Sequence, residues 1–133
     1  MIEKILCVDD DPITLMLCRK VIEKAGFAST TDSATNGEDA LRYFDRLITA
    51  ADVIRPTLIF LDLNMPVMGG WEFLDHFSGE PYKALFNNIK VIVLSSTIDP
   101  HDIEKANTYP MVLQFMSKPI TIEMLEELKT KLT

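Results

Sequence analysis

Short apolar runs alternate along this chain with longer segments in which apolar residues recur every three or four positions. Short apolar runs bounded by turn residues are typical of buried strands, and the longer periodic segments are typical of helices that lie against a sheet. Strands that alternate with helices predict βα units, which build a parallel sheet covered by helices. The predicted strands span residues 4–8, 57–61, 90–94 and 112–116, with a Ser- and Thr-rich edge strand somewhere within 28–34.

The helices expected between and after these strands follow from the apolar spacing. Residues 78–88 are expected to be irregular instead, because Gly79, Pro81 and the pair Asn87-Asn88 interrupt regular structure. The predicted helices span residues 12–25, 38–51, 70–77 and 121–132, with a further one within 100–108.

The first of these helices carries signals at both ends. Asp11 can cap its start, Pro12 suits the first helical position, and Gly26 suits the stop. Its apolar residues at i, i+4 spacing are expected to face the sheet, with Met16 beside them. These residues are Ile13, Leu17, Val21 and Ala25.

The order of the elements restricts the topology. Right-handed crossovers on a five-stranded parallel sheet leave few arrangements. The commonest for five βα units is the flavodoxin-like order 2-1-3-4-5, a doubly wound α/β fold in which the first and third strands flank the switch point. Ligands bind there, beyond the carboxyl ends of the strands. A length of 133 residues fits a single domain that spans residues 1–133.

Polar residues follow four of the predicted strands, at the edge where ligands are expected. Asp9 and Asp10 follow the first strand, Asp62 the third, Ser95 the fourth and Lys118 the fifth. A carboxylate at the end of a buried strand is costly unless its charge is used there. A single aspartate after the first strand could serve only to cap the next helix and offset the positive end of its dipole. Several carboxylates that converge with an ammonium indicate a binding or catalytic site instead. Because hard oxygen ligands suit Mg²⁺, these residues predict a site that binds a divalent cation and takes a phosphoryl group onto an aspartate.

Composition narrows the class of protein. A hydrophobic content of 47% with 25% charged residues fits an ordinary globular domain. The net charge of −7 argues against direct binding of nucleic acid, because no basic stripe offers contacts to phosphates. No apolar run approaches the roughly 20 residues of a membrane helix, and the N-terminus lacks the features of a signal peptide. Cys7 and Cys18 are expected to be buried free thiols, and the protein is expected in the cytoplasm.

Four motifs occur in order at the predicted strand ends. They are Val8-Asp9-Asp10-Asp11-Pro12, then Leu61-Asp62-Leu63-Asn64-Met65-Pro66 continuing through Met68 to Gly70, then Leu94-Ser95-Ser96, and Lys118-Pro119. Each motif is weak singly, but all four together are highly specific. Over nearly its whole length the chain resembles a receiver domain of two-component response regulators, similar in extent to the stand-alone chemotaxis type.

The resemblance implies a role for each residue of the site. Asp62 would be the phosphoacceptor, and Lys118 would neutralise charge during the transfer. Mg²⁺ would be held by Asp10, by Asp62 and by the backbone carbonyl of Asn64, with Asp9 acting through water.

The resemblance also implies a switch and its partners. A phosphohistidine on a sensor histidine kinase or a histidine phosphotransfer protein would donate the phosphoryl group, Ser95 would then move toward it, and Phe115 would fill the vacated space. This movement would alter the face built from the helix within residues 100–108, the strand 112–116 and the helix 121–132, and would thereby control a downstream protein that the sequence does not identify. The chain would catalyse its own phosphorylation and dephosphorylation without being a turnover enzyme. It would be a monomer or a weak, phosphorylation-dependent dimer.

Other functions stay open at this point. A receiver-like module that binds partners without phosphorylation typically lacks the acceptor, an acid or the lysine, all of which are present. A hydrolase that forms an aspartyl-phosphate would want an acid two residues after the nucleophile, where Asn64 stands. Flavin binding would require a phosphate-binding loop after the first strand. His76 and His101 are expected to be solvated helical residues rather than phosphorylation sites, and the start at Met1 favours a complete single-domain regulator.

Overall fold

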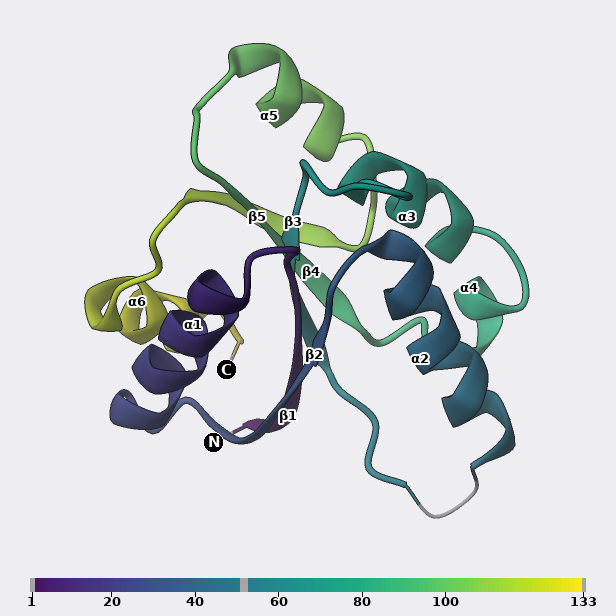
Figure 1. Cartoon of the computed structure of the whole chain (residues 1–133), viewed down its shortest axis with the longest axis horizontal. Coiled ribbons are helices and arrows are strands. Elements are labelled where there is room, and N and C mark those ends of the chain that lie inside the picture. The colour runs from purple at the N-terminus through teal and green to yellow at the C-terminus, as the bar shows by residue number, and fades with distance from the viewer. Residues whose placement is uncertain (1, 51–52, 133) are drawn as a thin grey trace.

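The chain folds into three layers, in which helices cover both faces of a central sheet (Figure 1). The computed structural model describes residues 2–50 and 53–132. The five strands of this part are parallel and are hydrogen-bonded in the order β2-β1-β3-β4-β5. The predicted flavodoxin-like α/β fold is therefore confirmed.

The predicted elements are confirmed with small shifts at their ends. The strands are β1 Ile2–Val8, β2 Ala28–Ala34, β3 Leu58–Asp62, β4 Lys90–Ser95 and β5 Val112–Ser117. The helices are α1 Pro12–Lys24, α2 Gly37–Thr49, α3 Gly70–Phe77, α4 Tyr82–Leu85, α5 Pro100–Ala106 and α6 Ile122–Leu132. Residue 51, the predicted end of the second helix, lies outside the described residues. Within the described ranges, no helix combines the length and the apolar character needed to cross a membrane.

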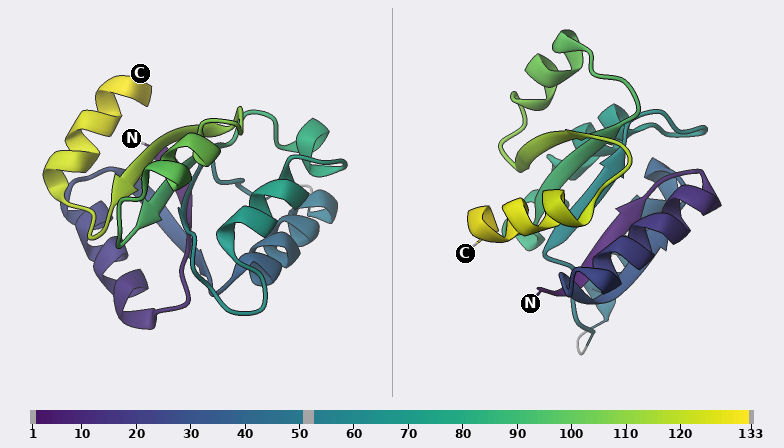
Figure 2. Two further views of the ribbon diagram at one scale, coloured as in Figure 1. Left: turned by 90° about the horizontal axis from the view of Figure 1, so that it is seen from above. Right: turned by 90° about the vertical axis from the view of Figure 1, so that its left-hand side faces the viewer.

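Two apolar cores pack the helices against the sheet. α1 and α6 lie together on one face, and α2 and α3 lie on the other (Figure 2). Neighbouring residues of β1 point to opposite cores: Leu6 and Val8 face α2 and α3, whereas Ile5 and Cys7 face α1 and α6. A slip of one residue would exchange the two faces, so this alternation stabilises the observed strand register.

Aromatic rings join α2 to α3. The ring of Phe44, in α2, lies 4.8 Å from that of Phe77 and 6.4 Å from that of Phe73, both in α3. Phe44 and Phe73 are fully buried. Because both helices follow parallel strands, this packing brings their N-termini to the same carboxyl edge of the sheet.

The expectation of irregular structure throughout residues 78–88 is wrong for its middle, where α4 makes a single helical turn. The Glu80 carboxylate accepts a hydrogen bond from the Ala84 backbone N–H, and the Phe86 N–H donates to the carbonyl of Tyr82. Phe86 then enters the α2–α3 core, with its ring 5.0 Å from that of Phe44. Burial of Phe86 in this core stabilises the turn. The sequence does not indicate the turn, because the residues around it disfavour helices.

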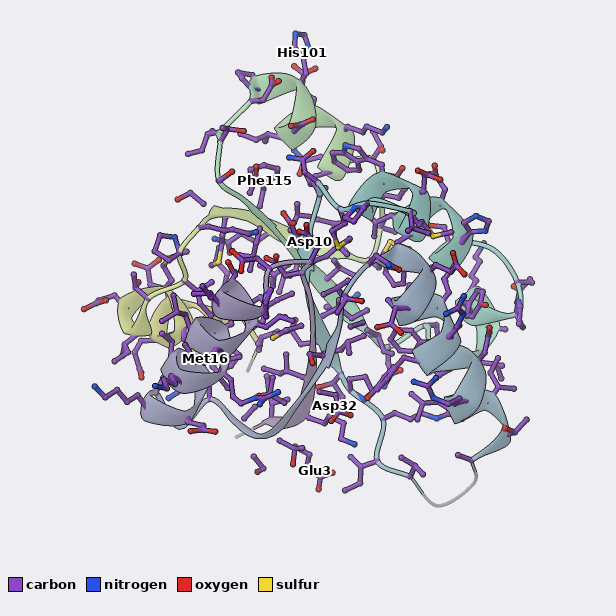
Figure 3. All side chains as sticks on the ribbon, in the orientation of Figure 1. Glu3, Asp10, Met16, Asp32, His101 and Phe115 are labelled. Carbon is purple, nitrogen blue, oxygen red and sulfur yellow. The ribbon has the colours of Figure 1, made fainter. Side chains whose placement is uncertain are left out.

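The predicted inward face of α1 is also wrong in part. Cys18 and Ile22 are the buried residues of the helix, and Val21 and Ala25 pack only at the margin of this core. Leu15 also packs at this margin, whereas three other apolar residues point outward: Ile13 is 63% exposed, and Met16 and Leu17 are each 48% exposed (Figure 3 labels Met16). The helix carries two apolar stripes of helical spacing, and the spacing cannot tell which of them meets the sheet.

The two stripes of α1 differ in their predicted effect on stability. We expect Ile22→Ala to lower the free energy of unfolding by about 3 kcal/mol, because it leaves a cavity in a closed core. Leu17→Ala should change it by no more than about 0.5 kcal/mol, since about half of the residue is exposed and it lies outside the closed core. Urea unfolding followed by circular dichroism measures both, and equal losses would contradict the observed orientation of α1.

Candidate functional site

Three carboxylates meet at the switch point between β1 and β3. Asp62 is the last residue of β3, and Asp9 and Asp10 directly follow β1, which pairs with β3. One carboxylate oxygen from each lies within 4.8 Å of the others. Asp9 and Asp62 are only 5% and 6% exposed, whereas Asp10 faces solvent at the top of β1 (Figure 3). The structure therefore brings together the three acids predicted to form the site.

Lys118 binds two of these acids at once. Its Nζ lies 2.5 Å from Asp9 Oδ2 and 3.1 Å from Asp62 Oδ1. Lys118 thus pairs with Asp62, but its shorter contact is to Asp9. The Lys118 backbone N–H donates to the carbonyl of Ser95 at 2.8 Å, which aligns the residues after β5 with the end of β4. The peptide bond from Lys118 to Pro119 is cis.

Burial and the charge of Lys118 shift the pKa of Asp62 in opposite directions. Burial raises the pKa of Asp62 above its usual value, and the hydrogen bond and positive charge of Lys118 and the backbone N–H of Asn64 only partly compensate. Burial alone would lower the pKa of Lys118, but its hydrogen bonds to Asp9 and Asp62 outweigh this and raise it. Lys118 is therefore held as an ammonium that serves two buried carboxylates.

The donor set fits a hard divalent cation. One ammonium stands against three carboxylates, which leaves an excess of negative charge at a place partly closed to water. Carboxylate and carbonyl oxygens are the ligands that Mg²⁺ takes, and it keeps several waters in its shell. The exposed side of Asp10 leaves room for such waters. The residues present are thus suited to Mg²⁺.

The thiols near the site are not suited to ligation. Cys7 and Cys18 are free and buried, as the sequence predicts. Burial, with a contribution from the charge of Asp9, raises the pKa of Cys18 to about 11. A thiol with such a pKa stays protonated at neutral pH and is a poor ligand or nucleophile.

Ser95 lies on β4, the strand next to β3, and Phe115 lies on β5, the edge strand beyond β4. Ser95 ends β4, is 1% exposed, and its Oγ accepts a hydrogen bond from the Thr97 N–H at 3.2 Å. Phe115 lies on β5 in register with Val93 and is half-buried beside the core below α5 (Figure 3). His101 is exposed on α5, far from Asp10 (Figure 3), and does not belong to the site.

The loop that follows Asp62 holds a strained backbone. Val67 has φ +69° and is 75% exposed, and the Met68 N–H donates to the carbonyl of Pro66 at 2.8 Å across it. A β-branched residue rarely adopts positive φ, because its Cβ crowds the backbone. No sequence signal predicts this conformation at Val67, since glycine or asparagine usually occupies such turns.

The comparisons with known proteins agree with this site. Residues 5–130 match the family described as the response regulator receiver domain. The chain belongs to this family, whose members act as phosphoacceptor switches in two-component systems.

Individual relatives cover the chain to different extents. Sporulation initiation phosphotransferase F of Bacillus subtilis is 31% identical over 127 residues, which are 96% of this chain and 90% of that protein. A two-component response regulator from Cytophaga hutchinsonii is 34% identical with a TM-score of 0.88, and the match covers 98% of this chain and 96% of that one. CheY4 of Vibrio cholerae shares the fold over both whole chains, with a TM-score of 0.75 and 21% identity. A protein-glutamate methylesterase/protein-glutamine glutaminase of Treponema pallidum is 39% identical over 69% of this chain, and the match spans only 20% of that protein.

The strain at Val67 yields a prediction on stability. Val67→Gly removes the crowded Cβ, and we expect it to raise the free energy of unfolding by about 1 kcal/mol even after the added flexibility of the unfolded chain. Val53→Gly, at another exposed valine in the described chain, should give no gain. Urea unfolding of both variants is the measurement, and a loss of stability in Val67→Gly would contradict strain at this residue.

Proposed function

We propose that this chain is a single receiver domain in which Asp62 accepts a phosphoryl group from a phosphohistidine in a Mg²⁺-dependent reaction. The observation that carries the proposal is the cluster at the end of β3, where a buried aspartate lies between a lysine and two further acids. Mg²⁺ would be held by Asp10, Asp62 and the carbonyl of Asn64, with Asp9 contributing through water. When bound, it would offset the charge of the phosphoryl oxygens and so permit two anions to approach each other.

The residues of the chain have separate parts in the transfer. An Asp62 carboxylate oxygen forms a bond to phosphorus while the phosphorus–nitrogen bond of the phosphohistidine breaks, and the imidazole leaves with that electron pair. Lys118, already between Asp9 and Asp62, is near enough to pair with the phosphoryl oxygens. Most of the rate gain would come from position and preorganised charge. Water later hydrolyses the acyl phosphate, so the chain would return to its unphosphorylated state by its own reaction.

Ser95 and Phe115 would convert phosphorylation into a change of surface. Ser95 ends the strand beside β3, and its Oγ contacts only the nearby Thr97 N–H among the hydrogen bonds described, a contact that is easily exchanged. Phe115 is half-buried, so it has room to move inward when the loop after β4 shifts. The face that would change is built from α5, β5 and α6, and it would control a downstream protein or a weak dimer.

The outward stripe of α1 supports a protein as the phosphodonor. Ile13, Met16 and Leu17 are exposed on the helix that begins directly after Asp10 and Asp11. Exposed apolar residues gathered next to a site commonly mark a protein interface. A sensor histidine kinase or a histidine phosphotransfer protein docked there would hold its histidine near Asp62.

The alternatives have less support. A phosphorylation-independent binding module would have no use for a lysine shared by two buried aspartates. An aspartyl-phosphate hydrolase would need a proton donor near the leaving group, and Asn64 is an amide in an exposed position.

Phosphorylation of Asp62 is tested directly by intact-mass spectrometry. We expect acetyl phosphate with Mg²⁺ to add one phosphoryl group to the wild type and none to Asp62→Asn, because an amide oxygen is a poor nucleophile. Chelation of Mg²⁺ should abolish the addition. Asp75→Asn, which changes an exposed aspartate bound to Tyr109, is the matched control and should be phosphorylated like the wild type. Equal addition to Asp62→Asn would refute the proposal.

Docking on α1 is tested by comparing two donors. We expect the double variant Met16→Ala, Leu17→Ala to accept phosphoryl from a phosphorylated histidine phosphotransfer protein about tenfold more slowly than the wild type, since lost apolar anchors weaken encounter complexes. Its reaction with acetyl phosphate should be unchanged. Leu85→Ala removes an exposed apolar side chain at α4 and is the control for both donors. A slower reaction with acetyl phosphate as well would mean that the substitutions disturb the site itself.

A further inference from the structure

We propose that Gly37, the first residue of α2, is a positioning residue that holds the metal-binding loop in place, an inference that rests on the proposed Mg²⁺ site. The loop spans residues 63–69 and contains Asn64, whose carbonyl is the proposed ligand. Gly37 lies in a different βα unit and contacts none of the acids in the contacts described. Its effect on the site would pass through Met68.

A hydrogen bond joins α2 to this loop. The Gly37 N–H donates to the carbonyl of Met68 at 2.8 Å. Backbone N–H groups in the first turn of a helix have no partner within the helix. The Asn36 side chain satisfies the N–H of Asp39, and Met68 satisfies that of Gly37. The N-terminus of α2 is thus completed by the loop, and the loop is in turn fixed to a helix.

The approach of the two backbones requires glycine. A Cβ at Gly37 would lie 2.7 Å from Met68 Cγ, 2.9 Å from the Met68 carbonyl oxygen and 3.0 Å from that of Gly69. The side chain of Met68 could move aside, but two of these contacts are to backbone oxygens. A methyl group at this position would therefore displace the loop or the helix. The packing of Phe44 against Phe73 and Phe77 resists movement of the helix, so we expect the loop to give way.

The loop carries the displacement back to the site. It is closed at its base, where the Gly70 N–H donates to the carbonyl of Leu63 at 3.0 Å. Val67, on the far side of the loop, has a positive φ that is unfavourable by itself. It directly precedes Met68, whose carbonyl is bound by Gly37. Without the anchor at Gly37, this turn can relax toward ordinary φ values, and Asn64 would shift with it. Gly37 thus maintains a strained loop in the shape that keeps Asn64, whose backbone N–H binds Asp62, beside the acids.

The test is a Mg²⁺ titration of Gly37→Ala in the absence of any phosphodonor. Amide NMR spectra are the main readout. Fluorescence of Trp71, the single tryptophan of the chain, is a second one, because Trp71 follows Gly70, where an added Cβ would lie 2.6 Å from the Asp62 carbonyl oxygen. We expect the Mg²⁺ dissociation constant to rise about tenfold, as is typical when a partner that orients a metal ligand is lost. The amide signals of Asn64 and Met68 should shift even without Mg²⁺.

Two further variants separate position from stability. Gly26 has φ +59° with open space around its would-be Cβ, so Gly26→Ala should lower stability through strain without moving the loop. Its Mg²⁺ affinity should equal that of the wild type. Adding Met68→Ala to Gly37→Ala removes the tightest contact and should recover part of the affinity. This double variant also serves for the titration if Gly37→Ala alone does not fold.

The outcomes distinguish this inference from the proposed function. A wild type that does not bind Mg²⁺ would overturn the proposed metal site. A wild type that binds Mg²⁺, together with a folded Gly37→Ala of equal affinity, would overturn only the role of Gly37. If Gly37→Ala alone does not fold, equal affinity in the double variant would do the same. A loss of affinity in Gly26→Ala as large as that in Gly37→Ala would show that general destabilisation is the cause, and would also overturn it.

Discussion

The contact of one ammonium with two buried carboxylates is the interaction on which the functional end of this protein depends. Asp9 and Asp62 are almost fully removed from water, and Lys118 lies within 3.1 Å of both. Buried charges are tolerated only when they are paired and hydrogen-bonded, and removal of one partner leaves an uncompensated charge that is far more costly than the pair. The arrangement is not the most stable way to fill this space. Its residual negative charge suits a hard divalent cation.

The fold explains why these charges can meet. Parallel strands end at the same edge, and the 2-1-3-4-5 order sets β1 beside β3, so that residues more than fifty positions apart become neighbours. The apolar cores below the edge keep β1 and β3 in fixed register, which holds Asp9 and Asp62 at contact distance. The loop after β3 is less well determined by its own sequence, because Val67 adopts a backbone conformation that valine disfavours. Its contact with the N-terminus of α2 supplies what the local sequence does not.

Membership of the response regulator receiver family was predicted from four motifs, each at the end of a strand. The prediction succeeded because each motif joins an apolar run, which forms a strand, to polar residues at its end. The strand order then places these polar residues at the same edge of the sheet. Prediction was weaker where apolar residues were abundant. In α1, the stripe through Ile13 and Leu17 has the same spacing as the buried pair Cys18 and Ile22, and only contact with the sheet selects the latter. The apolar stripe of α1 that does not contact the sheet lies on the surface, on the helix that follows Asp10.

The order of strands and helices, the α/β class and the convergence of Asp9, Asp10, Asp62 and Lys118 could be predicted from the sequence alone. These features follow from local periodicity and from a topology that has few solutions. The tertiary structure alone decided which side of α1 is buried, that Lys118 is shared between Asp9 and Asp62, and that α2 supports the loop after β3 through Gly37. Such features depend on distances between segments remote in sequence, where differences of an ångström separate a hydrogen bond from a clash, and residue spacing along the chain does not encode them.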